Sequence, residues 1–205
     1  MFQLALVPLL LLSADPKWEV AAETDGVKVY RRDKPGTDVK EMKANGTIDA
    51  PPKTVWDIIR NLEAYPKTMP YTEEAKVISR SEGDKEISFY SRIKAPMVDQ
   101  RDYVIVLKDE STMKDDGTGA YKVSWTTASP EKADAAVPLK KDVVRVRIND
   151  GYWLLEGADG GKKTNATYYL YTSPGGSVPT FIVNAANGTA VPDVFKAIRK
   201  AAAKK

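Results

Sequence analysis

The strongest constraint on the fold is the regular succession of strand-forming segments along the middle of the chain. These segments are rich in β-branched or alternating apolar residues, and most are separated by short turns such as residues 82–84 and 149–151. Strands joined by such short connections pair in antiparallel order. The chain is therefore expected to fold around one large antiparallel sheet, with strands at residues 75–80, 86–94, 102–108, 120–127, 143–149, 152–156 and 164–172.

A hairpin and two helices complete the predicted pattern. Residues 27–31 and 39–48 are predicted to pair as a hairpin, and residues 53–65 show a helical spacing of apolar side chains after Pro52. A last helix is predicted to begin at Pro192, and the uncharged stretch before it, which contains several Pro, Gly and Asn residues, reads as strand, turn and loop. One face of this last helix carries Val191, Val194 or Phe195, Ile198 and Ala202.

This order of elements predicts an α+β protein with one domain, residues 15–205. A long antiparallel sheet curls, and its concave face needs a cover, which the C-terminal amphipathic helix is expected to provide. The space between sheet and helix is either packed solid or hollow. Ten Tyr and four Trp against four Phe supply many rings with a polar tip. Such rings line ligand pockets, or they lie at strand edges and on the solvated face of a sheet, and composition leaves both readings open.

The N-terminal segment has the features of a secretory signal. Residues 1–14 contain no charge, and eleven of the fourteen are apolar. The stretch is shorter than the roughly 20 residues that span a bilayer, and it ends in small residues before a charged sequence begins. It lacks the positive charge of a typical signal, and the alternative is a buried or membrane-dipping segment. We expect cleavage near Ala14 and a periplasmic or secreted protein.

Missing residue types exclude several kinds of chemistry. The chain of 205 residues has no Cys and no His, which excludes serine–histidine and cysteine–histidine nucleophiles, zinc sites built on thiolate or imidazole, and haem held by His. The net charge is only +3 and is spread along the chain, which argues against nucleic acid as a partner. No motif indicates a catalytic residue, a metal or a cofactor, and we expect a monomer.

Three arginines lie in or beside predicted strands. Arg145 and Arg147 alternate with apolar residues and are expected on the solvated face of the sheet. Arg101 directly precedes an apolar run, where its guanidinium could bind a phosphate or carboxylate at the end of a pocket. The alternative is a structural ion pair with Asp102 or Glu86.

Four short motifs occur in order along the chain. They are residues 25–31 (Asp-Gly-Val-Lys-Val-Tyr-Arg), 100–104 (Gln-Arg-Asp-Tyr-Val), 144–146 (Val-Arg-Val) and 174–184, which runs from Pro-Gly-Gly-Ser-Val-Pro to Ile-Val-Asn. In this order and spacing the chain resembles the START (StAR-related lipid transfer) domain family, a helix-grip fold, and within it the phosphatidylcholine-transfer branch. The resemblance implies a curved antiparallel sheet around a long C-terminal helix, an internal hydrophobic cavity, and non-enzymatic binding or transfer of a lipid.

The resemblance also implies which side chains face the cavity. Alternate residues of a strand share a face, so the strand that begins at Arg101 turns every second side chain inward. The expected ligand-binding residues are Arg101, Tyr103, Ile105, Leu107, Tyr168, Leu170, Phe195 and Ile198. Ligand uptake requires the last helix or a neighbouring loop to move, with candidate hinges at Gly175, Gly176 and Gly188, the last in a loop at residues 187–189.

The identity of the cargo stays open because the chain departs from the family's known head-group sites. Sterol-binding members place an Arg where this chain has Leu107, and the Gln and Tyr that the phosphatidylcholine binder uses would fall at Gly151 and Leu170. The expected partners are a lipid or other hydrophobic small molecule and, transiently, a membrane surface. Two alternatives are a helix-grip enzyme of the polyketide cyclase or aromatase type, using Tyr, Arg or a buried Asp as acid or base, and a ligand-sensing interaction module.

Overall fold

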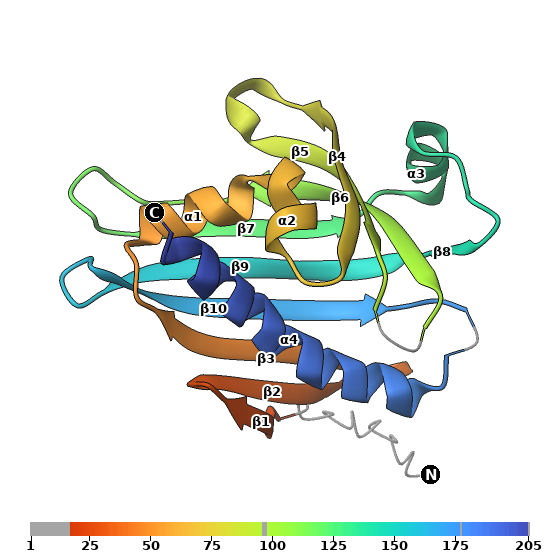
Figure 1. Ribbon diagram of the computed structural model, residues 1–205, viewed down its shortest axis with the longest axis horizontal. Helices are drawn as coiled ribbons and strands as arrows, with labels where there is room; N and C mark the ends of the chain where they lie inside the picture. Colours follow the sequence, from red (N-terminus) through yellow and green to blue (C-terminus); the bar gives the residue numbers. More distant parts are fainter. Residues whose placement is uncertain (1–16, 96–97, 177, 205) are drawn as a thin grey trace, which may run out of the picture.

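The computed structural model describes residues 17–95, 98–176 and 178–204 (Figure 1). Within these ranges, ten strands form one sheet in the order β1-β2-β3-β10-β9-β7-β6-β5-β4, and β8 pairs with β6. All pairings are antiparallel except that of β8, which runs parallel to the start of β6. The strands are β1 (Glu19–Thr24), β2 (Val27–Lys34), β3 (Thr37–Ile48), β4 (Thr72–Arg80), β5 (Glu86–Ile93), β6 (Gln100–Asp109), β7 (Ala120–Thr127), β8 (Val143–Arg145), β9 (Ile148–Ala158) and β10 (Lys163–Ser173).

The longest helix lies across one face of this curved sheet. It contacts β1, β2 and β3 as well as the first two α-helices (Figure 1). The predicted α+β architecture, a curved antiparallel sheet gripping a C-terminal helix, is therefore confirmed. The helices are α1 (Pro52–Arg60), η1 (Leu62–Ala64), α2 (Tyr65–Thr68), η2 (Glu82–Asp84), α3 (Pro130–Ala136) and α4 (Thr180–Ala202).

The C-terminal half of α4 is anchored in the main hydrophobic core. Val191, Phe195 and Ile198 are almost completely buried there. The absence of a side chain at Gly46 on β3 makes room for the Phe195 ring, because a Cβ at this position would lie 3.0 Å from Phe195 Cε1. This half of α4 therefore packs directly against the sheet.

The prediction for the start of this last helix was wrong. The helix α4 begins at Thr180, and Pro192 lies inside it. Glycine and proline weaken an isolated helix, by about 1 and 3 kcal/mol respectively. The sequence before Pro192, which contains such residues, therefore predicts a loop. In the folded chain this stretch lies over the sheet, and tertiary packing overrides the local preference.

Several other boundaries also differ from the prediction. The helix expected over residues 53–65 is three short elements, α1, η1 and the start of α2, and Pro66 lies in the first turn of α2, where proline is tolerated. The strand expected over residues 143–149 is divided between β8 and the start of β9. Strand β1 and helix α3 were not predicted. None of the helices in the described ranges combines the length and the apolar character that a membrane-spanning helix needs.

Candidate functional site

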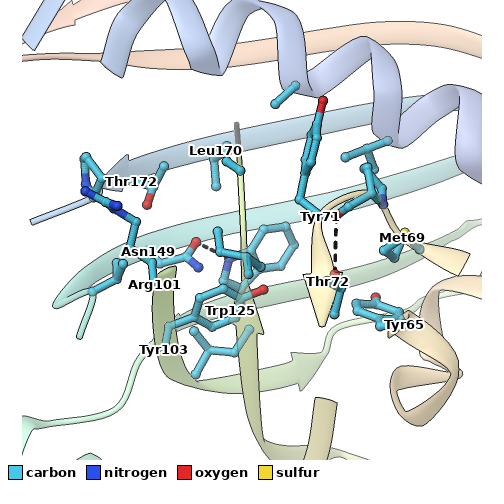
Figure 2. Close-up of a pocket in the computed structure, with 18 of the residues that line it drawn as sticks. Tyr65, Met69, Tyr71, Thr72, Arg101, Tyr103, Trp125, Asn149, Leu170 and Thr172 are labelled. Carbon is cyan, nitrogen blue, oxygen red and sulfur yellow. Dashed lines mark hydrogen bonds between the residues drawn. The ribbon is translucent and has the colours of Figure 1, made fainter. Parts of the chain in front are cut away.

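A cavity of about 430 Å³ lies between the concave face of the sheet and α4 (Figure 2). Its walls come from β5, β6, β7, β9 and β10, from the segment between α2 and β4, and from α4. Most of the lining side chains are aliphatic or aromatic. The volume lies within the roughly 300–1,000 Å³ of sites that enclose small molecules, so the interior is hollow and large enough for a ligand.

Six of the eight predicted ligand-binding residues line this cavity. On β6 the inward-facing side chains are those expected from a period of two, and on β10 two further predicted residues face the same space. Whether they contact a ligand stays a prediction. The six residues are Arg101, Tyr103, Ile105, Leu107, Tyr168 and Leu170.

The other two predicted residues, Phe195 and Ile198, do not line the cavity. Both are fully buried in the solid core, on the side of α4 that packs against the sheet. Among the described side chains of α4, Thr189, Ala190 and Val194 line the cavity. The prediction placed Phe195 and Ile198 on the cavity side of the helix, whereas both fill the core and a neighbouring part of the helix, which includes Val194, covers the cavity.

The predicted hinge glycines lie in two different environments. Gly175 and Gly176 connect β10 to α4 and have φ values of 66° and 67°, in the left-handed region that glycine adopts without strain. Gly188 lies inside α4, so the loop predicted at residues 187–189 was wrong. A hinge role for Gly175 and Gly176 stays a prediction.

Several lining residues were not predicted from the sequence. Trp125 could have been found, because it shares a face of β7 with Val123, which also lines the cavity. The residues outside β6, β7 and β10 carried no such signal, because their positions depend on tertiary packing. The lining residues that the prediction missed include Tyr65, Met69, Tyr71, Trp125, Asn149 and Thr172.

A close backbone approach holds Trp125 in place. A Cβ at Gly151 on β9 would lie 2.3 Å from Trp125 Cζ2 and 2.4 Å from the carbonyl oxygen of Tyr169. The indole therefore lies over Gly151, where β9 has no side chain, and it contacts the ring of Tyr168 with a centroid distance of 5.8 Å. Gly151, the position at which the phosphatidylcholine binder has a Gln, thus shapes the cavity wall by leaving room for Trp125.

Burial keeps the tyrosines of the cavity uncharged. Loss of hydration raises the pKa of Tyr65, Tyr103 and Tyr168 above the ordinary value of 10.0. Neutral phenols are poor general bases at physiological pH. The lining residues that the structure describes include no Asp or Glu, so these tyrosines have no carboxylate partner in the cavity for acid–base chemistry.

Arg101 is the only charged residue among the described lining residues (Figure 2). Its side chain is almost fully buried, with 4% of its surface exposed. One terminal nitrogen donates to the backbone carbonyl of Asp99, while Nε is buried and has no partner within the described part of the chain.

Neither of the two structural partners considered for Arg101 is used. Asp102 instead pairs with Arg145, whose Nε and Nη2 donate to its two carboxylate oxygens at 2.6 and 3.1 Å. Glu86 lies at the opposite end of the paired strands, facing Lys108. Arg145 was expected on the solvated face and is buried, because β8 pairs with β6 and α3 covers it, whereas Arg147 is exposed as predicted.

A family profile described as polyketide cyclase/dehydrase and lipid transport matches residues 48–199. The chain belongs to this family. The match covers most of the sheet and almost all of α4, and so includes the walls of the cavity.

Relatives in this family include lipid carriers. An uncharacterized protein of Pseudomonas aeruginosa is 30% identical over 92% of this chain and 88% of its own length. The bovine phosphatidylcholine transfer protein is 27% identical over 90% of this chain and 83% of its own length. The resemblance to START domains, with its phosphatidylcholine-transfer branch, is therefore confirmed, and lipid binding and transfer is a function found within the family.

Solved structures agree with the fold. The StAR-related lipid transfer protein of Xanthomonas axonopodis superposes with a TM-score of 0.76 at 27% identity, covering 89% of this chain and 97% of the other. Human STARD10 gives a TM-score of 0.77 at 21% identity, covering 91% and 73%. At 21% identity, the similarity to human STARD10 shows a shared fold and nothing further.

Proposed function

We propose that the protein binds one lipid molecule in the internal cavity and carries it through water between membranes, without catalysing a reaction. The observation that carries this proposal is the hollow, mainly apolar interior of about 430 Å³ beneath α4. The transfer role of the relatives supports it. The N-terminal segment, which lies outside the described residues, is proposed to direct the protein to the periplasm or the exterior.

The cavity offers a way around the main barrier to lipid movement. At about 0.8 kcal/mol per methylene, a chain of about 16 carbons costs roughly 13 kcal/mol to expose to water. An apolar interior replaces the bilayer as the surroundings of that chain, so the net affinity depends on fit and on a few polar contacts. A carrier of this kind exchanges its cargo during transient contact with a membrane.

A vesicle assay with a matched pair of variants tests this function. Donor vesicles carry pyrene-labelled phosphatidic acid at a density that gives excimer emission, acceptor vesicles carry none, and the protein is expected to accelerate the appearance of monomer fluorescence. Ala190→Phe fills the cavity from α4 and should abolish the acceleration, whereas Ala136→Phe on the exposed end of α3 should not. Equal acceleration by wild type and folded Ala190→Phe would contradict transfer through the cavity.

A further inference from the structure

We infer that the cavity selects ligands whose single head group is an oxyanion, a carboxylate or a phosphate monoester, bound by Arg101. This inference rests on the proposed function and adds the chemistry of the head group. It starts from the charge of Arg101, which the described residues bury without any carboxylate partner. A buried charge is costly unless an opposite charge or a full set of hydrogen bonds compensates it.

The unused edge of the guanidinium has the geometry that two oxygens of an anion require. The Nε of Arg101 has no partner within the described ranges, and Nη2 donates no hydrogen bond there either. The same edge of Arg145, made by Nε and Nη2, holds both carboxylate oxygens of Asp102. Arg101 lines the cavity, and the edge of its guanidinium that Arg145 uses to bind a carboxylate has no partner among the described residues.

Asn149 supplies a second donor at the same end of the cavity. Its Oδ1 accepts a hydrogen bond from Trp125 Nε1 at 3.2 Å. Because an indole nitrogen can only donate, this bond fixes the amide oxygen toward Trp125 and leaves the Nδ2 donors for another partner, and the described residues make no hydrogen bond with them. Figure 2 shows Arg101, Asn149 and Thr172 together at one end of the cavity, with Tyr65, Met69 and Tyr71 at the other.

The cavity has a polar end and a mainly apolar wall, which correspond to the head group and the hydrocarbon chain of an amphiphile. Donors and one positive charge lie at one end, and no Asp or Glu among the described lining residues neutralises them or would attract a cationic head. The remaining wall is mainly apolar and suits a hydrocarbon chain. An uncharged or cationic head would leave Arg101 uncompensated.

Calorimetric titration of the delipidated full chain with four probes of equal chain length tests this inference. The probes are hexadecanoate, hexadecyl phosphate, hexadecan-1-ol and hexadecylamine. We expect the two anions to bind about tenfold or more tightly than the alcohol, and the amine to bind weakest. Arg101→Gln should lower the affinity for both anions to that for the alcohol and leave the alcohol unchanged. Lys108→Gln, an exposed position on the same strand, should match wild type.

The outcomes separate this inference from the function on which it rests. Equal affinity for alcohol and anions would overturn the selection of an oxyanion and leave lipid binding intact. Binding of none of the four probes would instead contradict the proposed function. If Arg101→Gln does not fold, the affinities of wild type and of Arg101→Lys for the four probes test the inference instead. Inorganic phosphate or acetate binding as tightly as the amphiphiles would overturn the assignment of the anion to a ligand's head group.

Discussion

Gly151 controls the wall of the cavity at the scale of a single residue. Replacing it with Ala would place a methyl group 2.3 Å from Trp125 Cζ2 and 2.4 Å from the carbonyl oxygen of Tyr169, and the backbone oxygen cannot move away. We expect Gly151→Ala to lower the free energy of unfolding by about 1–3 kcal/mol and to weaken ligand binding.

Denaturant unfolding measures this effect against Gly157→Ala in the same strand. At Gly157 the nearest atoms to an added Cβ are 3.8 and 3.9 Å away, so the stability should stay within about 0.5 kcal/mol of wild type. Equal stability of the two variants would show that Trp125 is not held as described.

The buried ion pair between Asp102 and Arg145 is expected to contribute strongly to the stability of the fold. Both side chains are at least 90% buried. Asp102→Asn leaves a buried guanidinium with part of its charge uncompensated, and we expect a loss of about 3–5 kcal/mol in the free energy of unfolding. The control is Arg147→Gln, which breaks a partly exposed pair with Asp134 and should cost less than about 1 kcal/mol. A loss below 1 kcal/mol for Asp102→Asn would contradict this view.

Glu41 makes stability depend on pH. Burial would raise the pKa of its carboxyl, but hydrogen bonds from Tyr169 and Arg32 and the charges of Arg32 and Lys34 outweigh burial, so its pKa lies below the ordinary 4.5. A lowered pKa stabilises the fold above the unfolded value, and this stabilisation is lost as the pH falls through the folded value.

Glu41→Gln should therefore be less stable than wild type by about 1–3 kcal/mol near neutrality, and the gap should narrow below about pH 4.5. Urea unfolding at a series of pH values measures the gap. The exposed Glu23→Gln should follow wild type throughout. A gap that stays constant down to pH 2 would contradict the role given to Glu41.

The sequence predicted the facing of a side chain correctly where this facing depends on one strand alone. Arg101, Tyr103, Ile105 and Leu107 share a face because side chains alternate along any strand. Arg145 alternates in the same way, yet its exposure depends on which strand and which helix cover it, and one segment does not contain that information. Asn149 likewise reaches the cavity through the sheet topology.

At the scale of elements, α4 is attached to the sheet on both sides of Pro192. Beyond Pro192 the helix is anchored by its core residues and by Arg199, which donates to the backbone carbonyls of Thr47 and Asp25. Before Pro192, Asn184 bonds to the backbone of Asp38 and Lys40 at the start of β3. Proline removes one helical hydrogen bond, so α4 is weakened at the point between these two anchored stretches.

An exposed hydrogen bond links α4 to the segment before β4. Tyr71 lines the cavity, has a φ of 60°, and donates from its hydroxyl to Asp193 Oδ2 at 2.8 Å. If α4 must move for ligand exchange, Tyr71→Phe should speed the release of a bound fluorescent lipid by about 2- to 10-fold, with the ring and its packing retained.

Stopped-flow release into excess acceptor vesicles measures this rate. Tyr30→Phe, on the hairpin outside the cavity, should release lipid at the wild-type rate. An unchanged rate in Tyr71→Phe would indicate that this hydrogen bond does not limit exchange.

Element-level prediction followed local periodicity. The strands with strong alternation were found, whereas the first half of α4 was missed because its Gly, Asn and Thr residues favour a loop in isolation. Helix α3 and strand β8 are short and depend on contacts with β6, so their own sequence contains little signal.

At the scale of the whole molecule, the sheet, the helix and the cavity form one arrangement. The order of elements and four sequence motifs were sufficient to predict the fold, because a long antiparallel sheet must curl and the chain ends in an amphipathic helix. The hollow interior could not be predicted from composition, because Tyr and Trp serve equally in solid cores and in pocket walls.

Native mass spectrometry of the protein purified from its own cells, without detergent or organic solvent, would detect a lipid in the cavity. We expect a population whose mass exceeds that of the polypeptide by one amphiphilic molecule, which Ala190→Phe does not retain. A protein that carries no such molecule, and takes none up from vesicles made of the same cells' lipids, would contradict this expectation.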